Sequence, residues 1–309
     1  MASTALSKPQ KRGISRRRRE EILLTILLMA PAVLIIAVVT VYPFLRSFWI
    51  SLIGWNLTRP QEGHPFLGLE NYRFILTDPL FLDSVRITLI FVIAAVTIEI
   101  TLAIGIALLL NRPFRGRWLV RMLALLPWAI PSVVNGIMWK WILNPSYGSL
   151  NGLLYSLGII DRYIVWLGSP DLALAMVTIA DIWKETPFIM LLFLAALQTI
   201  PHELYEAARV DGSSPVQSFF HITLPLIRPT LFVAVALRTI WALKSFDLIY
   251  TLTAGGPSNG TAVLGYYTYV KSFVSLQLGR GAAVAYIMTF AVLLLVIFYQ
   301  RALYREVKY

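Results

Sequence analysis

Residues 22–42 read ILLTILLMAPAVLIIAVVTVY and contain no charged side chain. An α-helix rises about 1.5 Å per residue, so about 20 apolar residues suffice to cross the hydrocarbon core of a bilayer. Four arginines at 16–19 precede the run, as they would in a secretory signal peptide. The run is too long for a signal peptide, however, and is followed by Tyr42 and Pro43 rather than by a small-residue cleavage site. We predict a retained first transmembrane helix.

Five further apolar segments are long enough to span a membrane as helices. They cover residues 88–110, 119–141, 172–197, 230–249 and 282–299. The 309-residue chain is 58% hydrophobic and 14% charged, with a mean hydropathy of +0.70, which exceeds what a soluble globular domain carries. The sequence therefore predicts an all-α polytopic membrane protein with six transmembrane helices in one membrane domain, residues 22–300.

The net charge of +11 raises the alternative of nucleic-acid binding, but the basic residues lie beside apolar runs rather than among surface aromatics. Cytoplasmic loops of membrane proteins carry an excess of Lys and Arg. With six spans, the basic groups within 8–19, 112–117, 209–228 and 301–308 all fall on one side. We expect both termini in the cytoplasm, as tails of residues 1–21 and 301–309, and no nucleic-acid partner.

The composition also limits the chemistry of the chain. It has no cysteine, and its three histidines are scattered in no metal-ligand spacing. We expect no catalytic residue, no metal site and no bound cofactor. An intramembrane enzyme would need a nucleophile and base that the sequence does not present.

Residues 261–278 are intermediate in character, with three tyrosines and a phenylalanine among polar residues. Amphipathic aromatic side chains are favoured at the membrane–water interface. We predict an external interfacial helix here. The alternative, a short seventh span, is opposed by Lys271 and Gln277, which interrupt the apolar run.

Residues 201–225 connect the fourth and fifth predicted spans and carry helix signals. Pro201 suits a first helical position and Gly212 a helix stop, while Ser214 and Gln217 have the spacing of a capping box with Pro215 at its first helical position. These signals predict a pair of short helices that lie under the membrane. An ordered connection of this kind favours a docking element, although a helix pair without a partner would show the same signals.

The same loop resembles the EAA loop of the permease subunits of bacterial ATP-binding-cassette importers. The match consists of the Glu-Ala-Ala triplet, a glycine six residues after the glutamate, and a Leu-Pro pair at fixed distance. In that family the loop couples the permease to its ATPase subunit, and the resemblance transfers this role to Glu206, Ala207, Ala208, Asp211, Gly212, Leu224 and Pro225. The sequence has no G-x-x-x-x-G-K-[ST] phosphate loop of its own. The resemblance thus places ATP and Mg²⁺ on partner subunits.

Separated sequence blocks extend the resemblance over most of residues 22–309, toward carbohydrate permeases of the maltose, trehalose and glycerol-3-phosphate type. They are GLENY at 68–72, LPWAIP at 126–131, ALQTIP at 196–201 and FDLIYTLTAGGP at 246–257. The resemblance implies the type I importer permease fold in the cytoplasmic membrane of a bacterium or archaeon. It also implies several partners: a second, similar permease, two ATPase subunits and an extracytoplasmic binding protein. We expect this chain to lack the large external domain and the additional N-terminal spans of the larger maltose permease.

Ionisable residues within membrane spans usually face a bundle interior or an aqueous cavity. Asp181, Lys184 and Glu185 share one face of the fourth predicted span by their spacing. Arg238 shares a face with Trp241 and Ser245 in the fifth. The second span contributes Glu99, and the fifth also carries Lys244 and Asp247. These charges either line a transport path or only bridge one another, as in Asp181 with Lys184 or Lys244 with Asp247.

Alignment on the motif blocks transfers the sugar site of the maltose-type permease to ten positions here. They are Trp128, Ser132, Asp181, Lys184, Glu185, Phe188, Arg238, Trp241, Ala242 and Ser245. Aromatic faces and hydroxyl-binding polar groups suit a di- or oligosaccharide such as maltose or trehalose, or a related polyol. Lys184 and Arg238, the two cations among these positions, would instead suit a sugar phosphate. A rival reading is an ion-driven secondary transporter or channel that uses Asp181, Glu99 or Arg238, which leaves the loop at 201–225 unexplained.

Overall fold

The computed structural model describes residues 16–303, so residues 1–15 and 304–309 of the two predicted tails lie outside the described part. Within residues 16–303 the chain is helical, and its only extended pairing is one isolated β-bridge between Ile53 and Phe66. The predicted all-α class is confirmed. The chain divides between Ile50 and Ser51 into two compact units.

The first unit is one apolar helix with a local irregularity. It consists of α1 (Arg16–Ile36), the π-helical turn η1 (Ala37–Val41) and α2 (Tyr42–Ser51), so the predicted first span extends beyond residue 42. The apolar side chains from Leu23 onward are exposed, as suits a helix surrounded by lipid. The π-turn is centred four residues before Pro43, where the proline ring would clash with the carbonyl of a regular α-helix. Proline thus explains the irregularity.

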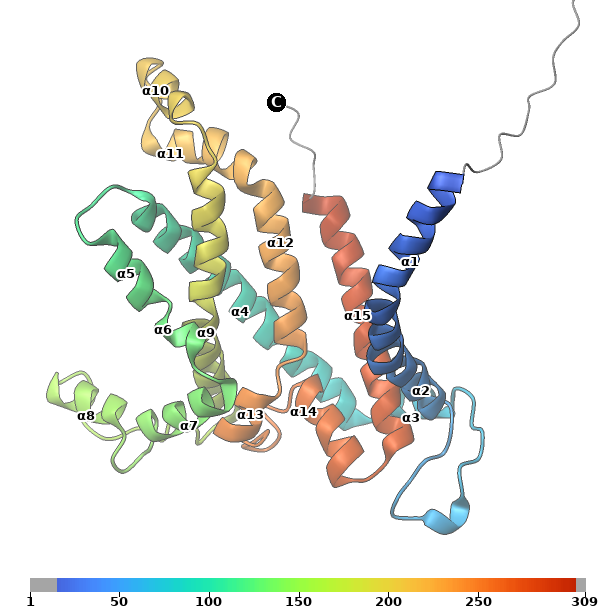
Figure 1. Cartoon of the computed structure of the whole chain (residues 1–309). Helices are drawn as coiled ribbons and strands as arrows, with labels where there is room; N and C mark the ends of the chain where they lie inside the picture. The colour runs from blue at the N-terminus through green and yellow to red at the C-terminus, as the bar shows by residue number, and fades with distance from the viewer. Residues whose placement is uncertain (1–15, 304–309) are drawn as a thin grey trace, which may run out of the picture. The chain divides into compact units, whose positions relative to one another are not determined.

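The second unit contains four long helices that run between its two ends (Figure 1). These are α4 (Pro79–Asn111), α9 (Pro170–Gln198), α12 (Leu224–Leu243) and α15 (Leu278–Leu303). Shorter helices connect them: η2 (Pro60–Glu62), α3 (Glu70–Thr77), α5 (Arg117–Ala124), α6 (Leu126–Ala129), α7 (Ser132–Ile142), α8 (Ser149–Ser156), α10 (His202–Val210), α11 (Pro215–Ser218), η3 (Phe219–Thr223), α13 (Asp247–Leu252), α14 (Leu264–Tyr269) and η4 (Val270–Val274).

The core of this unit forms where α4 packs along α9, with α12 against both. Small side chains permit this close approach, since lipid supplies no hydrophobic drive between helices and association depends on packing. Fully buried alanines lie along all three helices: Ala95, Ala103 and Ala107 on α4, Ala173 and Ala180 on α9, and Ala234 and Ala242 on α12. Helix α9 continues through Pro187 without a break.

The predicted third span, 119–141, is not one straight helix. The axis turns by 93° between residues 117–129 and α7, at Ile130 and Pro131. Pro131 lacks an N–H and restricts the residue before it to extended backbone, and Ile130 has a ψ of 127°. Four described helices are long and apolar enough to cross a membrane by themselves, or up to six if each of two bent pairs counts as one span.

The predicted fifth span, 230–249, is displaced toward the N-terminus. Helix α12 ends at Leu243, and a linker of residues 244–246 leads into α13. At its other end α12 continues from α11 through η3, so that Pro215–Leu243 is one helical stretch. The π-turn η3 is centred on His221, four residues before Pro225, as η1 is before Pro43. The second loop helix is therefore the start of α12 rather than a separate element.

The connections of the second unit gather at two opposite ends (Figure 1). One end carries α10, α11, the loop between α4 and α5, and the C-terminal end of α15. The opposite end carries α3, α7, α8, α13 and α14. The loops that we expected in the cytoplasm therefore lie together.

The segment predicted as an interfacial helix, 261–278, forms α14 and η4, which have six and five residues. Neither belongs to a membrane-length helix, so the alternative of a seventh span is wrong. One face of the segment is anchored to Asp78 at the start of α4: the Tyr267 hydroxyl donates to its carboxylate at 2.7 Å and the Lys271 ammonium lies 2.8 Å away. A position at the membrane surface stays a prediction.

The anchor also sets the ionisation of Asp78. Burial alone would raise its pKa, but hydrogen bonds from Lys271, Tyr267 and the Leu80 N–H outweigh this effect and hold the pKa below its usual 3.8. Burial and the neighbouring carboxylate raise the pKa of Tyr267 above its usual 10.0, so its hydroxyl remains a donor.

We predict that Asp78→Asn destabilises the protein by about 1.5–3 kcal/mol at pH 7, because Lys271 loses its charged acceptor while asparagine still caps α4. The folded-state pKa is lowered, so the stabilisation is present above 3.8 and is lost as the pH falls through the lowered value. Thermal melting in detergent, at pH 7 and at a pH below the lowered pKa of Asp78, measures the difference between wild type and variant. Glu70→Gln, at an exposed acid on α3, is the control. Equal melting of Asp78→Asn and wild type at pH 7 would contradict the anchor.

Candidate functional site

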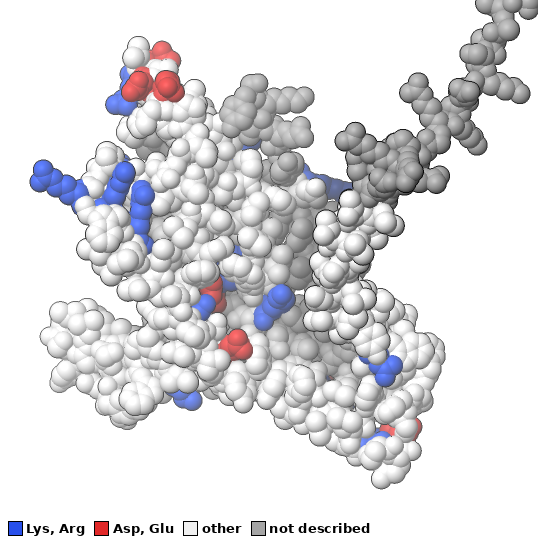
Figure 2. Space-filling view, in the orientation of Figure 1, with Lys and Arg blue, Asp and Glu red and all other residues white. Residues whose placement is uncertain are grey.

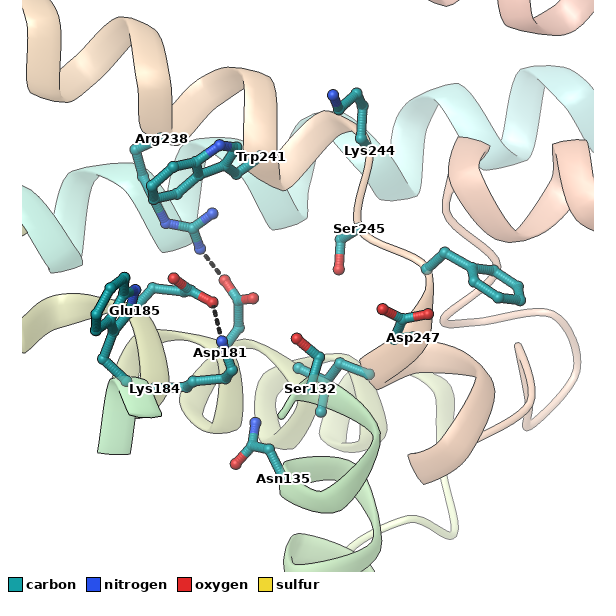
Figure 3. A pocket seen from close by; sticks show the side chains of 13 residues that line it. Ser132, Asn135, Asp181, Lys184, Glu185, Arg238, Trp241, Lys244, Ser245 and Asp247 are labelled. Atoms are coloured by element: carbon teal, nitrogen blue, oxygen red, sulfur yellow. Dashed lines mark hydrogen bonds and ion pairs between the residues drawn. The ribbon is translucent and has the colours of Figure 1, made fainter. Parts of the chain in front are cut away.

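A cavity of about 520 Å³ opens between α6, α7, α9, α12 and the linker to α13 (Figure 3). This volume is typical of small-molecule sites. Its walls combine aromatic, hydroxyl, amide and charged side chains: Trp128, Ser132, Asn135, Asp181, Lys184, Glu185, Arg238, Trp241, Lys244, Ser245, Phe246, Asp247 and Leu248. Of the described residues, no group of three or more His, Asp or Glu is arranged to hold a metal ion.

Arg238 on α12 lies between two carboxylates at the closed side of the cavity. It donates through Nε to Glu99 of α4 and through Nη2 to Asp181 of α9. The side chains of Arg238 and Glu99 are 1% and 0% exposed, and that of Asp181 is 10% exposed. A guanidinium away from water requires such pairing, because the desolvation of an unpaired charge costs several kcal/mol. One arginine thus connects the three packed helices.

A second ion pair lies beside the first. The Lys184 ammonium is 2.6 Å from the Glu185 carboxylate, and both side chains are largely buried. Figure 3 shows the two side chains meeting at the α9 wall. Both cations on this wall of the cavity are therefore neutralised by acids. The two pairs named as examples of mutual bridging, Asp181 with Lys184 and Lys244 with Asp247, do not form. Lys184 pairs with Glu185 and Arg238 with Asp181 instead.

The opposite wall is different, because Lys244 and Asp247 are exposed and form no ion pair with each other. Lys244 begins the linker after α12 and Asp247 is the first residue of α13, with Ser245 between them in the chain, and all three side chains are labelled at this wall of the cavity in Figure 3. This side of the cavity therefore presents one cation, one anion and one hydroxyl to a ligand.

Three aromatic rings form a stack along one side of the cavity. Phe188 lies between Trp128 and Trp241, with ring centroids 5.2 Å from each. Trp128 and Phe188 are nearly parallel, at 24°, and Trp241 is tilted by 51° from Phe188. Trp128 and Trp241 line the cavity, and Phe188 supports them from behind. Such faces suit the C–H surfaces of a sugar ring.

Eight of the ten predicted substrate positions line this cavity, and Phe188 and Ala242 do not. Phe188 supports the two tryptophans, whereas Ala242 is fully buried in the helix core. Five lining residues were not among the ten predicted positions: Asn135, Lys244, Phe246, Asp247 and Leu248. Of these, Lys244 and Asp247 had been considered only as span charges. The Nδ2 of Asn135 donates to the Ala180 carbonyl at 3.3 Å, and its buried Oδ1 has no partner in the protein. Only the turn at Pro131 brings Asn135 here, which no local signal in the sequence indicated.

The loop at 201–225 forms a tight helical corner at the other end of the unit. Gly212 has a φ of +78°, and the N–H groups of Gly212 and Ser213 donate to the carbonyls of Arg209 and Ala208. These two hydrogen bonds form a Schellman motif, in which the residue with left-handed backbone geometry is usually glycine. Helix α10 begins at His202, with Pro201 just before it. The predicted stop at Gly212 is confirmed.

The second half of the corner is equally well defined. The capping box of Ser214 and Gln217 is present with both of its hydrogen bonds, as predicted. The Tyr205 hydroxyl lies 2.8 Å from Thr223 Oγ1 and so ties α10 to the base of α12. This hydrogen bond links α10 to the helical stretch that continues into α12, the helix that carries Arg238 and Trp241.

The outer surface of the corner is acidic and apolar. Figure 2 shows acidic side chains gathered at the tip formed by α10, where Glu203, Glu206 and Asp211 are exposed. The side chains of Val210 and Val216 are 88% and 66% exposed. Exposed apolar side chains rimmed by charges are typical of an interaction surface.

Comparison with known proteins assigns the family. The family model described as "Binding-protein-dependent transport system inner membrane component" matches residues 99–309. The chain belongs to this family. It is a multi-pass membrane protein of the kind that forms the permease subunits of ATP-binding-cassette importers.

Curated relatives match nearly the whole chain. The sulfoquinovosyl glycerol transport system permease of Agrobacterium fabrum is 39% identical over 84% of this chain and 83% of that protein. The trehalose/maltose transport system permease of Thermococcus litoralis is 40% identical over 85% of this chain and 88% of that protein. The trehalose transport system permease of Mycobacterium tuberculosis is 37% identical over 83% and 80%, respectively.

Solved structures share the fold. A chain from a bacterial ABC transporter involved in the import of the acidic polysaccharide alginate superposes with a TM-score of 0.80 at 24% identity, covering 95% of this permease and 99% of that chain. A second structure is of an alginate transporter in complex with its alginate pentasaccharide-bound periplasmic protein. A chain of it reaches a TM-score of 0.77 at 25% identity, over 92% of this permease and 94% of that chain.

We predict that Arg238→Met in this permease lowers the yield of folded protein sharply, because breaking a buried ion network costs about 3–5 kcal/mol. The triple variant Arg238→Met, Glu99→Gln, Asp181→Asn removes all three charges together and should recover much of the loss. Lys244→Met removes an exposed cation of the same cavity and is the control. Size-exclusion chromatography and thermal melting measure the outcome. A stable Arg238→Met single variant would contradict the structural role.

Proposed function

We propose that this chain is a membrane-spanning permease subunit of an ATP-driven sugar importer. The observation that carries the proposal is the cavity, in which an aromatic stack faces hydroxyl, amide and charged groups within a bundle of the importer permease family. Three relatives at 37–40% identity are named for carbohydrate or carbohydrate-derived substrates. These names support a sugar as the cargo.

We further propose a neutral di- or oligosaccharide, such as maltose or trehalose, rather than a sugar phosphate. The cations Arg238 and Lys184 are both occupied by carboxylates and leave little positive field for an anion. Lys244 and Asp247 offer a donor and an acceptor of opposite charge, which suits hydroxyl groups. Uptake of an anionic sugar in preference to a neutral one would overturn this assignment.

For coupling, we propose that α10 and the following turn dock into an ATPase subunit through Glu206, Ala207, Ala208, Asp211 and Gly212. The hydrogen bond between Tyr205 and Thr223 would pass the movement to α12, which has Leu224 and Pro225 in its first turn. The importer would then alternate between inward-open and outward-open states. ATP drives this exchange only because it binds the two states with different affinity.

The remaining parts of the assembly follow from this role. We propose six spans, both termini in the cytoplasm, and a place in the cytoplasmic membrane. The partners would be a second similar permease, two ATPase subunits that hold ATP and Mg²⁺, and an extracytoplasmic binding protein. The chain itself would make and break no bond and hold no cofactor.

Reconstitution tests the proposal directly. Proteoliposomes with this chain, its partner permease, the ATPase and the binding protein should take up labelled maltose or trehalose only with internal ATP. Liposomes with this chain alone should take up none under a proton or sodium gradient. Gradient-driven uptake by the chain alone would support a secondary transporter and overturn the proposal.

We predict that Glu206→Lys weakens attachment of the ATPase about tenfold, because it reverses a charge at the docking surface. The protein should still insert and fold, since Glu206 is exposed. Co-purification with the tagged permease measures the attachment. Glu203→Lys, an exposed acid one turn earlier on α10, is the matched control. Undiminished recovery of the ATPase with Glu206→Lys would count against docking through this residue.

We predict that Trp241→Ala lowers sugar uptake more than tenfold while the complex still assembles, because it removes one face of the aromatic stack. Trp241→Phe should retain part of the activity. Trp141→Ala, an exposed tryptophan at the end of α7, is the control for truncation. Labelled-sugar uptake and the yield of assembled complex are the two measurements. Normal uptake by Trp241→Ala would remove this residue from the site.

A further inference from the structure

Five aromatic rings form a continuous contact strip beside the cavity. They are Phe246, Tyr250, Tyr266, Tyr269 and Phe273, here called the aromatic strip. The ring of Phe246 lies 4.8 Å from Tyr269, 5.3 Å from Tyr250 and 6.5 Å from Tyr266. Tyr269 continues to Phe273 at 5.7 Å. The contacts join rings from three separate segments: the linker after α12, α13, and the α14–η4 segment.

A glycine lets the backbone of α14 approach the linker closely, which brings the rings of the two segments together. Gly265 of α14 faces the linker, and a Cβ added there would lie 2.5 Å from the Ser245 carbonyl oxygen. The opposite face of α14 and η4 is the one anchored to Asp78 through Tyr267 and Lys271. On the other face, Tyr266 is partly buried against the hydrophobic core, Tyr269 is partly exposed and Phe273 is exposed. Tyr250 and Phe273 are 47% and 68% exposed.

The aromatic strip begins at the cavity and continues to the end of the second unit that lies opposite α10 and α11. Phe246 lines the cavity directly between Ser245 and Asp247. The helices α13 and α14, which carry Tyr250, Tyr266 and Tyr269, lie at the end of the unit opposite α10 and α11 (Figure 1), and Phe273 follows α14 on η4. If α10 and α11 face the cytoplasm, as proposed above, the strip reaches the external side. A ligand that enters from outside would meet the strip before the cavity.

We propose that the aromatic strip is a carbohydrate-binding subsite that receives sugar units on their way from the external side into the cavity. This inference rests on the proposed function. Ring faces pack against the C–H surfaces of pyranoses, and the three tyrosine hydroxyls offer both donors and acceptors to sugar hydroxyls. Two ring-to-ring steps, of 4.8 and 5.7 Å, separate Phe273 from the cavity residue Phe246. The strip therefore provides several adjacent faces rather than one.

Two other roles for these rings predict different behaviour. Tyrosines that only mark the membrane interface contact lipid headgroups, and rings that only pack against a second permease stabilise assembly. Neither role requires the rings to continue into a polar cavity through Phe246. Both roles predict that loss of the rings reduces the amount of assembled complex.

The double variant Tyr269→Leu, Phe273→Leu removes two ring faces and keeps apolar bulk. In the complete reconstituted importer, uptake of ¹⁴C-labelled maltose, trehalose and maltotriose is measured together with ATPase activity and complex yield. We expect at least a fivefold loss of uptake, with ATPase activity and yield within twofold of wild type. Tyr269→Phe retains the ring but lacks the hydroxyl, so it should keep more uptake than the double variant. Phe290→Leu, an exposed ring on α15, is the control for loss of an aromatic in lipid.

Each other outcome has a defined meaning. Unchanged uptake by the double variant overturns the subsite while leaving the proposed function intact. A parallel loss of uptake, ATPase activity and yield assigns the rings to assembly or to the membrane interface and also overturns the subsite. If the wild-type importer takes up none of the three sugars, the proposed function fails, and the carbohydrate subsite fails with it.

Discussion

The ion network of Arg238 with Glu99 and Asp181 is the constraint on which the rest of the second unit depends. Each partner comes from a different long helix, and the arginine is almost completely buried. Charges away from water are stable only in mutual contact, so α4, α9 and α12 have to keep the register that brings these three side chains together. The alanines at the same helix interfaces permit the close approach that the network requires.

Prolines account for three of the departures from regular helix geometry. The π-turns η1 and η3 are each centred four residues before a proline, where its ring would clash with a regular helix. Pro131 has a larger effect, because it ends α6 and turns α7 by 93°. That turn places Ser132 and Asn135 across from Asp181. Helix α12 ends at Leu243, which leaves Lys244 and Asp247 exposed. The end of α6 and the end of α12 therefore both shape the cavity.

The two walls of the cavity therefore differ in their electrostatic character. On the side of α9 and α12, acids neutralise both cations, and the aromatic stack supplies a rigid face. On the side of the linker, one lysine and one aspartate remain available, and Phe246 leads outward to the aromatic strip. A polar, sterically defined wall opposite a flat aromatic one is well suited to a ligand with C–H faces and many hydroxyls.

By itself the sequence determined the class of the protein, its membrane-length helices, the loop with its capping box and glycine stop, and most of the cavity residues. These features depend on apolar length, on local hydrogen bonding and on short motifs, all of which operate over a few neighbouring residues. Only the tertiary structure decided which charges pair, where the predicted third and fifth spans break, and that Asn135 and Phe246 reach the cavity. Such outcomes depend on residues far apart in the chain: Arg238 selects Glu99 and Asp181 over nearer charges because three helices bury them together.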